Sequence, residues 1–132
     1  MKTSPMPRAA ILAFIALLRD PITGYDWDYE RDVPNGNDAK ERFENLGKRL
    51  LKEIATRLKL TDAKITWNPG GPAVSGDLYL EATGLYINFS QTALGFDWGF
   101  MYRYKDGGNR WMKWDELRHL DRLTETFANR PK

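Results

Sequence analysis

The sequence predicts one α+β domain over residues 1–132, with two N-terminal helices, an antiparallel β-meander of three to five strands and a C-terminal helix packed on one sheet face. Near both ends of the chain, apolar residues recur at the three- and four-residue steps of a helix, whereas in the middle they alternate with polar residues. The reversals between the alternating segments are short, which is typical of antiparallel strands. A chain of 132 residues has room for one such core.

Composition narrows the class of protein. Apolar residues make up 42% and aromatic residues 13% of the chain, more than disordered proteins contain. Charges nearly cancel at +2, so the overall charge favours neither nucleic acid nor an anionic membrane. The absence of cysteine excludes disulfides and thiolate metal ligands, and it is compatible with a reducing compartment.

The first helix is expected over residues 5–19. Ser4 would cap it, Pro5 would occupy its first position, and Pro21 would disfavour its continuation. Its middle is apolar on nearly every side, so more than one face must be covered, either by the rest of the domain or by self-association with a second copy.

A secretory leader is the alternative for this segment, because Lys2 and Arg8 stand near the apolar residues 9–18. No small-x-small cleavage site follows, and the apolar run is too short to cross a bilayer. We therefore interpret it as a core helix and expect a cytoplasmic protein with no membrane association.

The second helix is expected over residues 39–60, after a loop at 33–38, "VPNGND". Asp38 and Glu41 have the spacing of a capping box. An apolar stripe should face the core, formed by Phe43, Leu46, Leu50, Ile54 and Leu58. Glu44 with Lys48, and Glu53 with Arg57, are spaced to pair on the opposite side.

Strands are predicted in "KITW", "AVSGDLYLEA", "GLYINFSQ" and "GFDWGFMYRYK", from residue 64 to residue 105. Their alternation places one set of side chains inward: Leu78, Leu80, Leu85, Ile87, Phe89, Phe96, Trp98, Phe100, Tyr102 and Tyr104. After "RWMKW", a last helix over residues 115–128 should bury Leu117, Leu120, Leu123 and Phe127.

The most unusual local pattern is "GYDWDYERD" at residues 24–32, with acids at alternate positions and aromatics at most positions between. In an extended strand, alternate side chains share a face at a spacing of about 6.7 Å. We predict a displayed row of carboxylates that docks on the basic surface of a protein partner, with these residues as the binding site: Asp26, Trp27, Asp28, Tyr29, Glu30 and Asp32. The alternative is an edge strand whose acids prevent aggregation.

No metal site, cofactor or catalytic residue is predicted, and an enzyme in which two of the acids at residues 24–32 bind magnesium with a substrate phosphate stays open as a third alternative. A calcium loop would require glycine where Arg31 stands and glutamate where Asn37 stands. The GxSxG and SxxK motifs are absent, and the single histidine, His119, is expected at the surface. We therefore expect a protein that is not an enzyme.

Single-stranded nucleic acid is the alternative partner. The second helix carries seven basic residues against four acids between Asp38 and Lys59. Basic residues of this helix would contact the phosphates, and polar-face residues of the strands would stack on the bases. The site predicted for this alternative is Lys48, Arg49, Lys52, Tyr79, Tyr86 and Arg103. The near-neutral total charge weakens this alternative, because phosphate contacts supply most of the affinity.

The segments "GGPAVSGDLYL" and "LYINFSQ", within residues 70–91, resemble small uncharacterised accessory proteins of bacterial phages and plasmids. The resemblance implies no activity and no residue roles. It implies an accessory gene product, and many of these bind and block another complex. The function predicted from the sequence is therefore a non-enzymatic protein-binding module that acts stoichiometrically, as an inhibitor of a bacterial defence complex.

Overall fold

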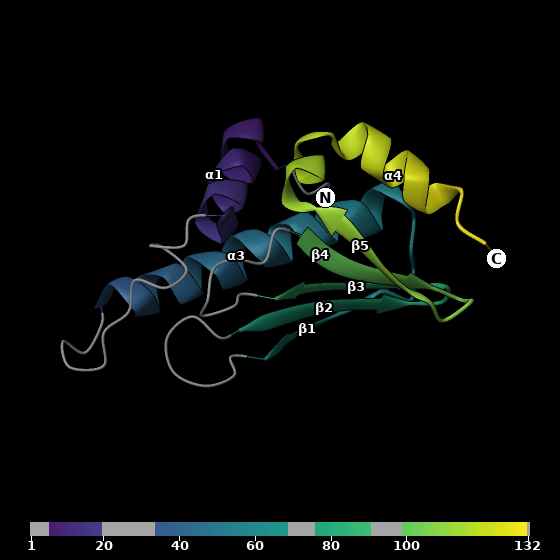
Figure 1. The fold of residues 1–132 in the computed structure, drawn as a ribbon, viewed down its shortest axis with the longest axis horizontal. Helices are drawn as coiled ribbons and strands as arrows, with labels where there is room; N and C mark the ends of the chain where they lie inside the picture. Colours follow the sequence, from purple (N-terminus) through teal and green to yellow (C-terminus); the bar gives the residue numbers. More distant parts are fainter. Residues whose placement is uncertain (1–5, 20–33, 69–75, 91–98, 132) are drawn as a thin grey trace.

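A five-stranded sheet with helices on one face forms the body of the molecule (Figure 1). The computed structural model describes residues 6–19, 34–68, 76–90 and 99–131. The helical segments are α1 (Arg8–Arg19), α3 (Pro34–Arg57), the 3₁₀ helix η2 (Trp114–Arg118) and α4 (Leu120–Ala128). The strands are β1 (Lys64–Asn68), β2 (Asp77–Ala82), β3 (Leu85–Ser90), β4 (Gly99–Tyr104) and β5 (Asn109–Lys113). The predicted α+β class is confirmed.

The strands form an antiparallel meander in the order β1-β2-β3-β4-β5. The predicted meander is therefore confirmed, and "RWMKW" contributes to its fifth strand. Thr83 and Gly84 alone connect β2 to β3, and Gly84 has a φ of +80°, which a residue with a side chain rarely adopts.

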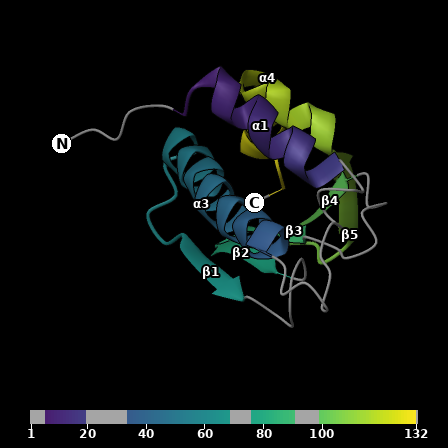
Figure 2. The same cartoon turned by 90° about the vertical axis from the view of Figure 1, so that its left-hand side faces the viewer.

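Strand side chains alternate between a dry inner face and a wetter outer face. In β2 and β3 the inward residues are fully or almost fully buried, as predicted: Leu78, Leu80, Leu85, Ile87 and Phe89. Phe100 and Tyr104 of β4 are also buried, whereas Phe96 and Trp98 lie outside the described residues. The helices cover this inner face (Figures 1 and 2).

Helix α3 lies on the inner face with its apolar stripe inward. Phe43, Leu50 and Ile54 are fully buried, and so is Leu51, which the predicted stripe did not contain. The predicted start of this helix is wrong. Residues 34–38 belong to α3, because proline fits the first turn of a helix, where its missing N–H is not needed.

The predicted end of α3 at residue 60 is also wrong. The helix ends at Arg57, and Lys59 adopts a left-handed conformation with φ 57°. The Lys59 N–H then donates to the Thr56 carbonyl at 3.1 Å, and the Leu60 N–H donates to the Ala55 carbonyl at 3.0 Å. These two bonds are those of a Schellman cap, which satisfies the last carbonyls of the helix.

Helix α1 packs across α3 and η2 (Figure 2). Ile11, Phe14 and Ile15 are buried within this one chain, so the domain itself covers most of the apolar helix side chains that the structure describes. Leu12 remains 37% exposed. The helix begins at Arg8 rather than at residue 5, and the Pro7 carbonyl accepts its first hydrogen bonds.

The C-terminal segment is two helices where one was predicted. η2 and α4 are separated by His119, whose φ of −117° and ψ of 63° interrupt the helical backbone. All four predicted core residues of this segment are nevertheless buried: Leu117, Leu120, Leu123 and Phe127. Phe127 contacts the rings of Tyr102 and Tyr104, which places α4 on the inner face of β4.

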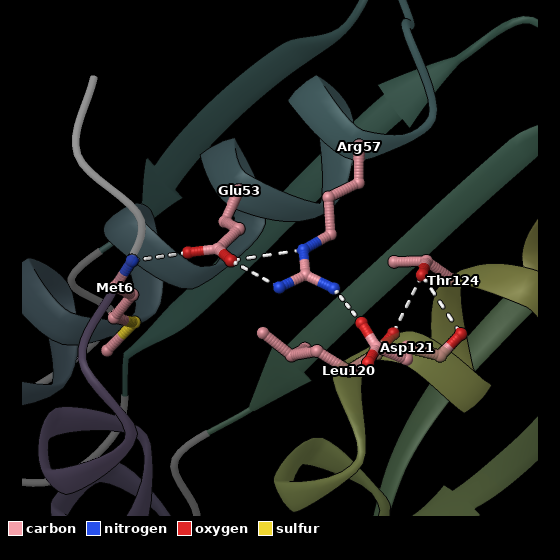
Figure 3. Close-up of polar contacts among 6 residues, drawn as sticks. All are labelled: Met6, Glu53, Arg57, Leu120, Asp121 and Thr124. Carbon is pink, nitrogen blue, oxygen red and sulfur yellow. Dashed lines mark hydrogen bonds and ion pairs between the residues drawn. The ribbon is translucent and has the colours of Figure 1, made fainter. Parts of the chain in front are cut away.

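A polar network links the start of the described chain, α3 and α4 (Figure 3). The Met6 backbone N–H donates to Glu53 Oε1 at 2.5 Å, and Glu53 Oε2 pairs with Arg57 at 3.0 Å. Arg57 also pairs with Asp121 of α4 at 2.7 Å. The side chain of Asp121 is almost fully exposed, so the pair between Arg57 and Asp121 adds little to stability.

Candidate functional site

The outer face of the sheet is covered by none of the described helices (Figures 1 and 2). The strand register places its side chains in two rows that each cross all five strands. One row is Thr66, Tyr79, Asn88, Met101 and Trp111, and the other is Lys64, Glu81, Tyr86, Arg103 and Asn109. We call these ten residues the open face.

An aromatic and cationic cluster lies at the centre of the open face. The rings of Tyr79 and Tyr86 are 6.0 Å apart between centroids. The guanidinium of Arg103 lies 4.6 Å from the centroid of the Tyr86 ring, and it also donates to Asn109 Oδ1 at 3.3 Å. Three of the residues predicted to bind nucleic acid are therefore brought together: Tyr79, Tyr86 and Arg103.

Trp111 is the most exposed large hydrophobic side chain in the described part of the chain, at 60%. It lies beside Met101 across the β4–β5 pair. Sequence reasoning did not single out this residue, although the alternation in "NRWMK" gives the signal: Met112 faces the core, so its neighbour Trp111 faces outward. An exposed tryptophan is a common anchor for a binding partner.

The open face carries charges of both signs. Glu81 belongs to the open face, and Asp77 lies on the same side of β2. Two carboxylates therefore lie near the tyrosines. Partial burial, then Tyr79 and these two carboxylates, raise the pKa of the Tyr86 hydroxyl above its ordinary value, against the opposing charge of Arg103. Tyr86 therefore keeps its proton at neutral pH and can donate a hydrogen bond to a partner.

The other half of the predicted nucleic-acid site lies elsewhere. Lys48, Arg49 and Lys52 are on α3, in the helical layer, and the sheet separates them from the open face. Lys48 is paired with Glu44 at 2.6 Å, whereas Arg49 and Lys52 are exposed. The prediction that the basic helix and the sheet aromatics form one surface is therefore wrong, because they lie on opposite sides of a two-layer fold.

The acidic-aromatic site, formed by Asp26, Trp27, Asp28, Tyr29, Glu30 and Asp32, lies outside the described residues, so the predicted row of carboxylates stays a prediction. Among the residues that the structure places, no group of three or more histidines, aspartates or glutamates is arranged to hold a metal ion. His119 is exposed, as expected.

Comparisons with known proteins give no functional lead for this arrangement. No protein-family model, no curated protein and no solved structure matches the chain. Within the described ranges, no helix has the length and apolar character needed to cross a bilayer.

Proposed function

We propose that this protein is a non-enzymatic binding module that engages a protein partner stoichiometrically through the open face. One observation supports the proposal: Tyr79, Tyr86, Arg103 and Trp111 share a sheet face that the described helices leave uncovered. Tryptophan, tyrosine and arginine contribute most of the binding energy at protein interfaces, and methionine, present here as Met101, is also enriched there.

The mixed charge of the open face favours a protein over a nucleic acid. A strand of nucleic acid needs cations along its backbone, but Glu81 and Asp77 lie close enough to Tyr86 to raise its pKa. The cations of α3 are in the other layer and do not offset these carboxylates. Protein interfaces tolerate such mixtures, because the partner can carry complementary charges.

Photo-crosslinking tests the proposal directly. A photoreactive phenylalanine analogue replaces Trp111 in one variant and Lys52, on the exposed side of α3, in a matched variant. Irradiation in cells of the source organism should give a protein adduct from position 111 and none from position 52. The purified partner should then bind at a one-to-one ratio by titration calorimetry. Adducts from position 52 alone would contradict the assignment of the open face.

Single-stranded nucleic acid is retained as a second candidate because the neighbouring rings of Tyr79 and Tyr86, tilted by 33° to each other, lie beside Arg103 on the open face. Fluorescence anisotropy with a labelled oligothymidine strand tests it. Tight binding that weakens with salt and is lost in Tyr86→Ala, but not in Lys52→Ala, would favour this candidate over a protein partner.

Two finer proposals come from the sequence. The acidic segment that contains Asp26, Asp28, Glu30 and Asp32 would add a contact to a basic surface of the partner, and replacing these four residues by lysine should weaken binding while the fold is kept. We also propose that the partner belongs to a bacterial defence complex, because the resemblance of residues 70–91 implies an accessory gene product and many of these block another complex. Expression in a strain that such a complex protects should then restore phage growth, and Trp111→Ala should abolish the restoration.

A further inference from the structure

The charges of the open face are unevenly distributed. On the outer side of β1 and β2 lie Lys64, Asp77 and Glu81, so that half carries both signs. On the outer side of β4 and β5 lie Met101, Arg103, Asn109, Trp111 and Lys113. These five positions, four residues of the open face and the adjoining Lys113, include two cations and no carboxylate, and we call them the β4–β5 half.

Arg103 is held in place without being neutralised by the described residues. Its guanidinium stacks on Tyr86 at 4.6 Å and donates to the amide oxygen of Asn109, and no described ion pair involves it. Asp106, in the adjoining turn, pairs instead with Arg110 at 2.5 Å. A guanidinium fixed in this way loses little further freedom when it binds a carboxylate through two hydrogen bonds.

An apolar contact area adjoins these cations. Trp111 is 60% exposed, and Met101 is its direct cross-strand neighbour. Trp111 therefore offers an exposed aromatic face beside an apolar neighbour, a combination typical of interface anchors.

From this arrangement we infer that the β4–β5 half binds a protein segment that presents carboxylates beside an aromatic or apolar side chain. The carboxylates contact Arg103 and Lys113, and the apolar side chain packs on Trp111 and Met101. This inference deepens the proposed function and rests on it: it specifies the chemistry of the partner at one half of the open face. Charge complementarity supports an acidic protein segment, while the Glu81 and Asp77 carboxylates beside Tyr86 disfavour a polyphosphate that would cross the whole face.

Titration of the ¹⁵N-labelled protein with defined probes tests the inference by NMR. The probes are a short peptide with two tryptophans flanked by glutamates, matched peptides with lysine or glutamine in place of glutamate, and a short oligothymidine strand. The glutamate peptide should shift the amide resonances of Met101, Arg103 and Trp111, with a Kd at least about tenfold below that of the lysine peptide. Added salt should weaken this binding.

Charge variants identify the cation responsible. Arg103→Glu should raise the Kd for the glutamate peptide by about tenfold or more, and the milder Arg103→Gln, which is less disruptive to the fold, should raise it by a smaller factor. Lys52→Glu makes the same change of charge as Arg103→Glu but lies in α3, so it should leave the Kd within about twofold. Circular dichroism and the dispersion of the amide spectrum verify that each variant folds.

The possible outcomes separate the inference from the proposed function. A glutamate peptide that binds no better than the lysine peptide, or binding that Arg103→Glu leaves unchanged, overturns the inference. Stronger shifts of the same resonances by oligothymidine overturn it in favour of nucleic acid. If one of the first two outcomes is observed but photo-crosslinking still gives a protein adduct from position 111, the proposed function stands and only the acidic partner is excluded. If that adduct is absent as well, both fail.

Discussion

Two tryptophans three residues apart have opposite environments. Trp111 is 60% exposed on the open face, whereas Trp114, at the start of η2, is 1% exposed and contacts the rings of Phe89 and Phe100. We predict that Trp114→Ala lowers the free energy of unfolding by about 3–5 kcal/mol, because it removes a large buried side chain. Trp111→Ala should change it by no more than about 0.5 kcal/mol, because surface substitutions rarely do more.

Urea unfolding followed by circular dichroism measures both changes. A loss of stability in Trp111→Ala that equals the loss in Trp114→Ala would mean that Trp111 is part of the fold rather than an anchor for a partner. The comparison therefore tests the open face without any knowledge of the partner.

Asp62 gives a pH-dependent prediction at the same scale. It accepts hydrogen bonds from the Thr83 hydroxyl at 2.5 Å and the Thr83 backbone N–H at 2.8 Å, and these bonds lower the pKa of its carboxyl below the ordinary value. The depressed pKa means that the carboxylate stabilises the fold above the unfolded pKa, about 3.9, and that this contribution is lost as the pH falls through the folded pKa.

The difference in unfolding free energy between the native protein and Asp62→Asn should therefore be constant above about pH 5 and should shrink toward pH 2. Urea unfolding at a series of pH values measures it. In Thr83→Ala, the carboxyl pKa of Asp62, followed by NMR, should rise toward its ordinary value, because the hydroxyl donor is removed. An unchanged pKa would contradict the assignment of that bond.

At the level of single residues, burial can be predicted from the sequence more reliably than a binding role. Alternation correctly assigns Leu78, Leu80 and Ile87 to the core, because in a two-layer fold the apolar set must face the helices. The proposed role of Trp111, in contrast, could be inferred only from the tertiary structure, in which no described helix lies over its face of the sheet.

At the level of elements, Gly47 sets how closely α3 approaches the sheet. A Cβ at this position would lie 2.3 Å from Leu78 Cδ1 and 3.3 Å from Phe14 Cζ, so the side chains of β2 and α1 occupy its space. We predict that Gly47→Ala is destabilising by about 1–3 kcal/mol, because overpacking the core outweighs the gain of about 1 kcal/mol in helix propensity.

Asn45→Ala is the matched control, because it changes an exposed residue of the same helix to the same amino acid. It should alter stability by no more than about 0.5 kcal/mol in the same urea experiment. A stabilised Gly47→Ala variant would show that Leu78 can move aside, and that the close approach of α3 does not depend on glycine.

The existence and order of the elements could be predicted, but several of their ends could not. The apolar period identifies α3, yet its first residues include Pro34, Gly36 and Asn37, which are typical of a loop. Its C-terminal cap is Lys59 in the left-handed conformation, at a position where glycine is the usual signal. The break at His119 also has no proline or glycine to announce it.

At the level of the whole molecule, the sequence could not predict which surfaces lie together. The cations of α3 and the tyrosines of β2 and β3 are all at least partly exposed, and a sequence gives no reason to separate them. The layer order separates them, because α3 uses its apolar stripe to cover the inner face of the sheet, while Tyr79 and Tyr86 point from the outer face. To predict a site formed by residues of several elements, one therefore needs the topology as well as the residue types.

The buried core links elements from both ends of the chain. One cluster contains Phe14 of α1, Leu50 of α3, Ile87 of β3 and Leu123 of α4. Because these elements share one core, we predict that the chain unfolds as a single cooperative unit, as expected for one domain. Tryptophan fluorescence and far-UV circular dichroism should give coincident urea transitions, and the calorimetric and van't Hoff enthalpies should agree.

Two variants of α4 test this cooperativity. Leu123→Ala should lower the stability of the whole protein by about 2–5 kcal/mol and shift both transitions together, because it opens a cavity in the shared core. Asp121→Ala, on the same helix, removes only the exposed pair with Arg57 and should cost no more than about 1 kcal/mol. If Leu123→Ala instead produced an early loss of helical signal with an unchanged main transition, α4 would be an independent unit docked on the sheet, and the prediction of one cooperative domain would be wrong.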